Sequence, residues 1–86
     1  MPKKKTAMVP KKTPDASTYS GRFAARLYAL RKKAGLSAEQ VAEELGLSPM
    51  AIYYWETGRR QPKISDLPKI AEVLKLKKIK DLYPNE

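Results

Sequence analysis

Residues 37–58, SAEQVAEELGLSPMAIYYWETG, constrain the fold of this chain more than any other stretch. Ser37 with Gln40 three residues later forms a capping box, which is typical of the start of a helix. Gly46 then supplies the positive φ angle that commonly ends one. The spacing therefore predicts a short helix at about residues 38–45, closed by a tight turn.

A second helix is predicted directly after that turn, at about residues 49–57. Ser48 is a candidate N-cap, and the proline after it occupies the first helical position, where a missing N–H does no harm. Ile52 and Trp55 lie three residues apart and share one face, so we expect both in the core. Ala42 is small enough to let the two helices cross closely. This is helix-turn-helix geometry, with the other faces of the second helix presented outward.

Apolar residues recurring every three or four positions predict three further helices. The apolar sets are Phe23, Leu27, Leu30 and Ala34; Leu67, Ile70, Ala71 and Leu74; and Leu76, Ile79, Leu82 and Tyr83. The first helix ends at Gly35, the fourth can start after Ser65 with Asp66 and Pro68 in its first turn, and Pro84 ends the short fifth. No convincing strand or internal repeat is visible, so the predicted fold class is all-α, with five helices.

Residues 1–20 differ in composition from the rest of the 86-residue chain. They hold three prolines and five lysines, with almost no periodic apolar pattern. Such a segment buries too little apolar surface to offset the entropy lost on ordering, so we expect a disordered basic arm. Residues 21–86 are then one small domain.

The charge balance points to a phosphate-bearing partner. The net charge is +9, and residues 21–86 remain basic when the arm is left out, with 13 basic and eight acidic side chains. Nucleic acid is the first candidate and an anionic membrane surface the second. No apolar run approaches the roughly 20 residues of a membrane span, and no signal peptide is visible, so we expect a cytoplasmic protein.

Catalysis and cofactor binding are not expected. The chain has no cysteine and no histidine, so it lacks thiolate chemistry, the usual general base and the commonest metal ligand. There is also no glycine-rich phosphate loop and no pair of carboxylates near an evident cleft. The sequence favours a binding protein without a cofactor or metal over an enzyme.

The run LRKKAGLSAEQVAEELGLSPMAIYYWETGRRQP, followed by LPKIAEVL, closely resembles the lambda-repressor/Cro-like (Xre-type) helix-turn-helix domain. The resemblance covers about residues 22–83 and implies a lambda-repressor-like domain that binds double-stranded DNA, with helix 49–57 in the major groove. Two positions depart from the family pattern. Ala38 replaces a glutamine that usually braces a phosphate contact, and the reading helix opens with Pro49-Met50-Ala51 instead of polar residues.

Four residues are expected to face the DNA bases. They are Pro49, Met50, Tyr53 and Tyr54. The resemblance implies that the first, second and fourth point at base edges. Proline and methionine side chains cannot donate hydrogen bonds, so we infer apolar contact with thymine methyl groups, plus one hydroxyl from Tyr54. For either tyrosine the alternative is packing against the fourth helix or the arm.

Six residues are candidates for contacts with DNA phosphates. They are Ser37, Ser48, Thr57, Arg59, Arg60 and Lys63. The three basic residues follow the reading helix, where they would lie over the backbone, although a solvated loop would carry the same charges. Thr57 and the two serines are weaker candidates, since helix capping alone would explain both serines.

The resemblance also predicts a salt bridge between Arg31 and Glu56 that ties the reading helix to the first helix. A free surface carboxylate is the alternative. A protein of this kind, without an effector domain, would act as a repressor by occupying an operator. Two-fold operators require dimers, and Leu82 and Tyr83 are the candidate dimer surface unless they complete the monomer core.

A protein-interaction module of the same fold is the competing function. Related helix-turn-helix domains serve as coactivator bridges or antitoxin components, and the apolar start of helix 49–57 suits a protein partner. The lysines of the arm, Lys3 to Lys5 with Lys11 and Lys12, could follow the DNA backbone or form a solvated tail. Strong salt dependence of binding to duplex DNA would favour the DNA-binding function.

Overall fold

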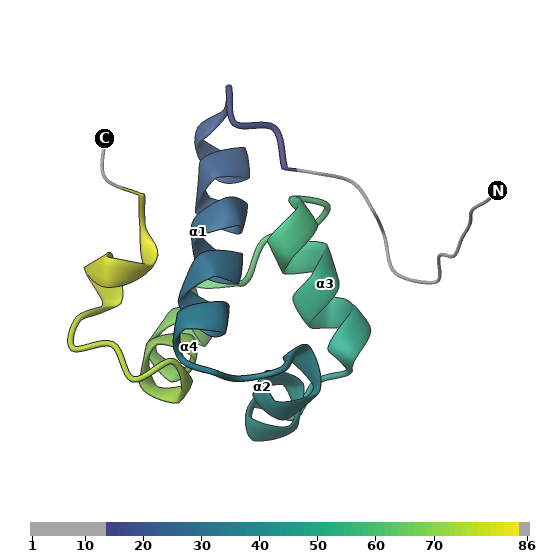
Figure 1. The fold of residues 1–86 in the computed structure, drawn as a ribbon, viewed down its shortest axis with the longest axis vertical. Coiled ribbons are helices and arrows are strands. Elements are labelled where there is room, and N and C mark those ends of the chain that lie inside the picture. Colours follow the sequence, from purple (N-terminus) through teal and green to yellow (C-terminus); the bar gives the residue numbers. More distant parts are fainter. Residues whose placement is uncertain (1–13, 85–86) are drawn as a thin grey trace, which may run out of the picture.

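The structure, a computed structural model, describes residues 14–84 and is all-helical over that range (Figure 1). The elements in chain order are α1 (Tyr19–Lys33), α2 (Ala38–Leu45), α3 (Pro49–Thr57), the 3₁₀ turn η1 (Ile64–Asp66), α4 (Leu67–Val73) and the 3₁₀ turn η2 (Ile79–Leu82). The predicted fold class is therefore confirmed, with four α-helices instead of five in the described part of the chain. None of the described helices is long and apolar enough to cross a membrane.

The helices surround one hydrophobic core. α3 packs against both α1 and α2, α4 packs against α2, and η2 closes the far side against α1 and α4 (Figure 1). The core residues are Phe23, Leu27, Ala38, Val41, Ala42, Ile52, Trp55, Leu67, Ile70, Ala71, Leu74 and Leu82. Burying these side chains is the dominant favourable contribution to the free energy of folding, and it holds α3 in a fixed orientation.

The helix-turn-helix pair forms as predicted, with the bounds of α2 and α3 at 38–45 and 49–57. The Ser37 N–H donates to Gln40 Oε1 at 2.7 Å, and the Gln40 N–H donates to Ser37 Oγ at 3.1 Å, so the capping box is complete. Gly46 ends α2 with a φ of 72°. Ser48 occupies the N-cap position of α3, but its side chain makes no cap hydrogen bond.

The first helix begins earlier than the sequence predicts. Thr18 is its N-cap and accepts the Gly21 N–H at 3.0 Å, so residues 19 and 20 belong to α1 and not to the arm. The turn before it packs tightly on the helix, because a Cβ atom at Gly21 would lie 1.8 Å from the Asp15 carbonyl oxygen. Glycine is therefore required here for close approach. Residues 14–18 of the expected arm form the turn before α1, and residues 1–13 lie outside the described residues.

The predicted fifth helix is wrong. Lys75 adopts a φ of 61° and ends α4, and the chain then runs to Lys78, which is extended. Tyr83 is extended as well, so only four residues remain between them. That interval closes a 3₁₀ turn, the usual form of such short helical segments.

The predicted dimer surface is corrected at Leu82, whereas for Tyr83 it stays a prediction. Leu82 has 0% of its surface exposed, so its side chain belongs to the monomer core and cannot contact a second copy. Tyr83 is half-buried, with its ring centroid 5.5 Å from that of Phe23. Both residues close the C-terminal end of the fold over α1.

Candidate nucleic-acid interface

One face of α3 is committed to the core and the opposite face is open. Ile52 and Trp55 are buried, as predicted. Met50 is 37% exposed, and Tyr54 is half-buried at the edge of the helix. Tyr53 is also half-buried and packs against the hydrophobic core.

A groove of about 450 Å³ runs beside this open face. It lies between α3 and the loop that follows the helix. Its lining includes Met50, Tyr54, Arg60 and Lys63, together with the exposed Leu47. The structure thus brings two predicted base-contact residues together with two predicted phosphate-contact residues. The lining also includes the carboxylate of Asp66. Its apolar and cationic side chains suit the methyl groups and phosphates of DNA.

The basic turn after α3, residues 59–63, projects into solvent. Arg59, Arg60 and Lys63 are all exposed. The guanidinium carbons of the two arginines lie 5.8 and 5.7 Å from the centroid of the Tyr54 ring. Arg60 lines the groove, whereas Arg59 lines a separate hollow between the start of α1 and the end of α3.

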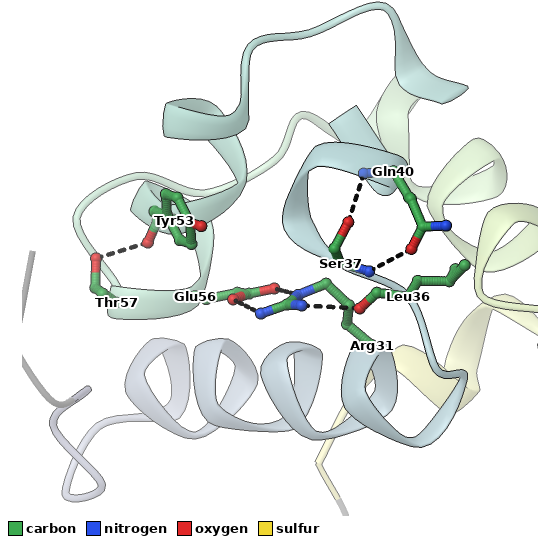
Figure 2. Close-up of polar contacts among 7 residues, drawn as sticks. All are labelled: Arg31, Leu36, Ser37, Gln40, Tyr53, Glu56 and Thr57. Atoms are coloured by element: carbon green, nitrogen blue, oxygen red, sulfur yellow. Dashed lines mark hydrogen bonds and ion pairs between the residues drawn. The ribbon is translucent and has the colours of Figure 1, made fainter. Parts of the chain in front are cut away.

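The three hydroxyl candidates differ in what their protons can do. Ser37 Oγ only accepts in the capping box, so its proton remains available for a phosphate. Ser48 is exposed and its side chain takes no part in capping. Thr57 donates to the Tyr53 carbonyl at 2.9 Å, which commits its proton within α3 (Figure 2). A phosphate contact from Thr57 would require that bond to break.

A buried ion pair fixes α3 to α1 (Figure 2). Arg31 Nε donates to Glu56 Oε2 at 2.6 Å and Nη2 donates to Oε1 at 3.0 Å, so the predicted salt bridge forms and is bidentate. Nη1 donates to the Leu36 carbonyl at 2.9 Å, which ties in the loop before α2. Both side chains are buried, and the hydrogen bonds to Glu56 raise the pKa of Arg31 above its usual value. The orientation of the reading helix therefore depends on this pair.

The sequence reasoning misses Tyr28. Its exposed ring lies 5.3 Å from the Arg31 guanidinium carbon and 6.0 Å from Lys32 Nζ, on the outer side of α1. The spacing of three and four residues along one helix is the signal that could have revealed it. The Arg31 guanidinium therefore lies over the Tyr28 ring as well as beside Glu56.

The described residues offer no group of three or more histidine, cysteine, aspartate or glutamate side chains that could hold a metal ion. Ala38, where the family usually has glutamine, is buried and presents only a methyl group. The chemistry of the face is therefore that of hydroxyls, apolar side chains and fixed positive charges.

The profile of the helix-turn-helix family matches residues 27–82, most of the described domain. The chain belongs to the helix-turn-helix family, of the Cro/C1 (Xre) type. This family match supports a DNA-binding transcription regulator.

Solved structures share the fold. The restriction-modification controller protein C.AhdI from Aeromonas hydrophila is 31% identical, with a TM-score of 0.67, and the match covers 72% of this chain and 92% of that protein. Hydroxypropylphosphonic acid epoxidase from S. wedmorenis is 29% identical, with a TM-score of 0.69, over 86% of this chain but only 36% of the enzyme. Apo-HppE matches similarly, at 31% identity and a TM-score of 0.70, over 78% of this chain and 37% of that one. A search of curated proteins finds no match.

Proposed function

We propose that this protein is a transcriptional repressor that inserts α3 into the major groove of an operator. One observation carries the proposal: a single groove joins Met50 and Tyr54 of α3 to the cationic side chains of Arg60 and Lys63. In this arrangement the first pair meets base edges and the second pair meets phosphates. Occupancy of the operator would exclude other proteins from it.

The base contacts in this proposal are mainly apolar. Pro49 and Met50 offer no hydrogen-bond donor, so they favour thymine methyl groups, while the Tyr54 hydroxyl supplies one polar contact. Sequence preference should therefore be modest and lean towards steps that contain thymine. Tyr53 is the weakest member of the set, because it packs against the core.

The comparisons support regulation over catalysis. C.AhdI, a controller protein, is matched over nearly its whole length, whereas the epoxidase is matched over about a third of its length. The shared part is the helical domain, which in this chain carries neither histidine nor cysteine. We therefore propose that this domain binds its partner and performs no reaction. Its site of action would be the cytoplasm, where operator DNA is met.

The test is selection of duplexes from a random pool at physiological salt, followed by affinity measurements on the selected duplex across a salt series. A converged, roughly palindromic site would support a dimeric repressor, and its half-site spacing would give the dimer geometry. Steep salt dependence without a converged site would leave DNA binding but remove operator recognition.

Matched substitutions sharpen that test. Lys63→Gln should lower the magnitude of the salt slope by about 1, because one phosphate contact is lost. Lys69→Gln removes the same charge from α4, in a separate hollow between α2 and α4, and should leave the slope unchanged. Equal effects of the two variants would contradict the proposed orientation.

A protein-interaction module is the second candidate. It is favoured by the exposure of Leu47 and Met50, two large apolar side chains on the same groove. A protein partner would cover them and exclude water. Two results together would favour this function over DNA binding. The chain would bind no duplex, and it would capture a protein partner whose binding Met50→Asp abolishes.

A further inference from the structure

The two arginines after α3 are held by Tyr54 through its backbone and its ring together. Gly58 adopts a φ of 81° and turns the chain back over the last turn of the helix. The N–H groups of Arg59 and Arg60 then both donate to the Tyr54 carbonyl, at 2.9 and 3.2 Å. The backbones of the two consecutive arginines are therefore both anchored to the carbonyl of Tyr54.

The side chains of Arg59 and Arg60 also contact Tyr54. The guanidinium carbons lie 5.8 and 5.7 Å from the Tyr54 ring centroid, within the range of a cation–π interaction. The planar guanidinium group packs on an aromatic ring in a way that an ammonium group does not. Free arginine side chains lose considerable rotamer entropy when they are ordered on a ligand, and holding them beforehand reduces that loss.

The charges themselves remain available. Within residues 14–84, neither Arg59 nor Arg60 forms an ion pair with a carboxylate. Both are exposed, and Arg60 lines the groove. An aromatic ring positions a cation without neutralising it, so the pair keeps its full charge for an anionic partner.

We infer that Tyr54 is a positioning residue, whose ring holds the guanidinium groups of Arg59 and Arg60 beside the C-terminal end of α3, where they meet DNA phosphates. This inference rests on the proposed function and separates two roles of one side chain. The ring orders the arginines for the sequence-independent contacts, while the hydroxyl is the group that faces a base.

Three variants distinguish these roles on the selected duplex and on a duplex of unrelated sequence. Tyr54→Leu should weaken binding to both duplexes by about three- to tenfold and lower the magnitude of the salt slope by about 1, because the arginines are no longer ordered. Tyr54→Phe keeps the ring, so the slope and the affinity for the unrelated duplex should be retained while discrimination falls. Tyr19→Leu is the matched control, since Tyr19 is an exposed tyrosine with Arg22 5.8 Å from its ring and lies outside the groove.

A double-mutant cycle tests whether Tyr54 acts through the arginines. In a chain that carries Arg59→Gln and Arg60→Gln, the further change Tyr54→Leu should alter affinity for the unrelated duplex less than twofold. A full Tyr54→Leu effect in that background, or an unchanged salt slope in Tyr54→Leu alone, would overturn the positioning role and leave DNA binding standing. If the unaltered chain bound no duplex, both the proposed function and this inference would fail. Thermal unfolding of each variant checks that the domain remains folded.

Discussion

At the scale of single residues, the buried Arg31–Glu56 pair ties α3 to α1. Glu56→Ala would leave a buried guanidinium without its partner, so we expect the free energy of unfolding to fall by about 3–5 kcal/mol. Replacing both partners, as in Arg31→Met with Glu56→Leu, should cost less. Urea unfolding at pH 7 measures both losses, and Glu43→Ala on the exposed face of α2 is the control, with an expected change within about 0.5 kcal/mol.

The same pair should not make stability sensitive to pH near neutrality. Its hydrogen bonds raise the pKa of Arg31, so the stabilisation is complete below the unfolded pKa of that group and is lost only in strong alkali. The free energy of unfolding of the unaltered chain should therefore stay level between pH 6 and 9. A fall over this range that is absent from the double variant Arg31→Met with Glu56→Leu would contradict this.

Asp15 gives the opposite pH dependence at the start of α1. The Ser17 hydroxyl and the Ser17 N–H both donate to its carboxylate, and they lower its pKa below the ordinary value of 3.8. The stabilisation of this turn is therefore present above about pH 3.8 and is lost as the pH falls through the lowered pKa. The amide resonance of Ser17 should follow that titration in NMR spectra, and Asp15→Asn should abolish the dependence. A Ser17 amide that moves at the same pH in both proteins would rule the contact out.

At the scale of the elements, the sequence predicts best what is decided locally. The bounds of α2 and α3 depend on a capping box, a turn glycine and a proline in the first turn, all within a few residues. The early start of α1 depends on the close approach of Asp15 to Gly21, which no periodicity shows. The fifth helix is missing because the backbone is extended at Lys78 and at Tyr83, which leaves only four residues between them.

The candidate site divides in the same way. The identity of the outward residues of α3 follows from helical spacing, and the ion pair between Arg31 and Glu56 follows from the family pattern. The bond from Thr57 to the Tyr53 carbonyl and the gathering of two arginines on Tyr54 depend on rotamers, which residue types alone do not determine. Which hydroxyl protons and which charges are free to contact a partner at the groove could therefore not be predicted from the sequence.

The end of α4 offers a test of element-scale strain. Lys75 is the one residue other than glycine with a positive φ, 61°, in the described range, and its N–H and that of Leu76 cap the helix by bonding to Glu72 and Ala71. Glycine adopts this conformation without a Cβ penalty, so Lys75→Gly should raise the free energy of unfolding by about 0.5–1 kcal/mol despite a more flexible unfolded chain. Lys75→Ala is the control for loss of the charge and should give no gain. Equal stabilities of the glycine and alanine variants would show that the backbone there is unstrained.

At the scale of the whole molecule, the position of η2 decides whether the C-terminal segment belongs to the monomer or to a dimer. Leu82 is fully buried within one chain, against α1 and α4. Leu82→Ala should therefore lower the free energy of unfolding by about 2–5 kcal/mol, through lost burial and the cavity left behind. Because Leu82 stabilises the monomer itself, the loss in free energy of unfolding should be the same at low and high protein concentration. Ile79→Ala, at an exposed position of the same turn, should change stability far less.

Two measurements on Leu82→Ala separate the monomer core from a dimer interface. The first is thermal unfolding across a hundredfold range of protein concentration. The difference between the unfolding midpoints of the variant and of the unaltered chain should be the same at every concentration. Sedimentation of the folded variant should give the same association state as the unaltered chain, because the side chain faces its own core. A loss that grows as the protein is diluted, with a shift towards monomer, would place Leu82 between two copies instead. If the loss is instead independent of concentration, a dimer on a two-fold operator must use a surface other than the one that Leu82 occupies. Half-site spacing from the selected duplexes would then give the distance between the two α3 helices.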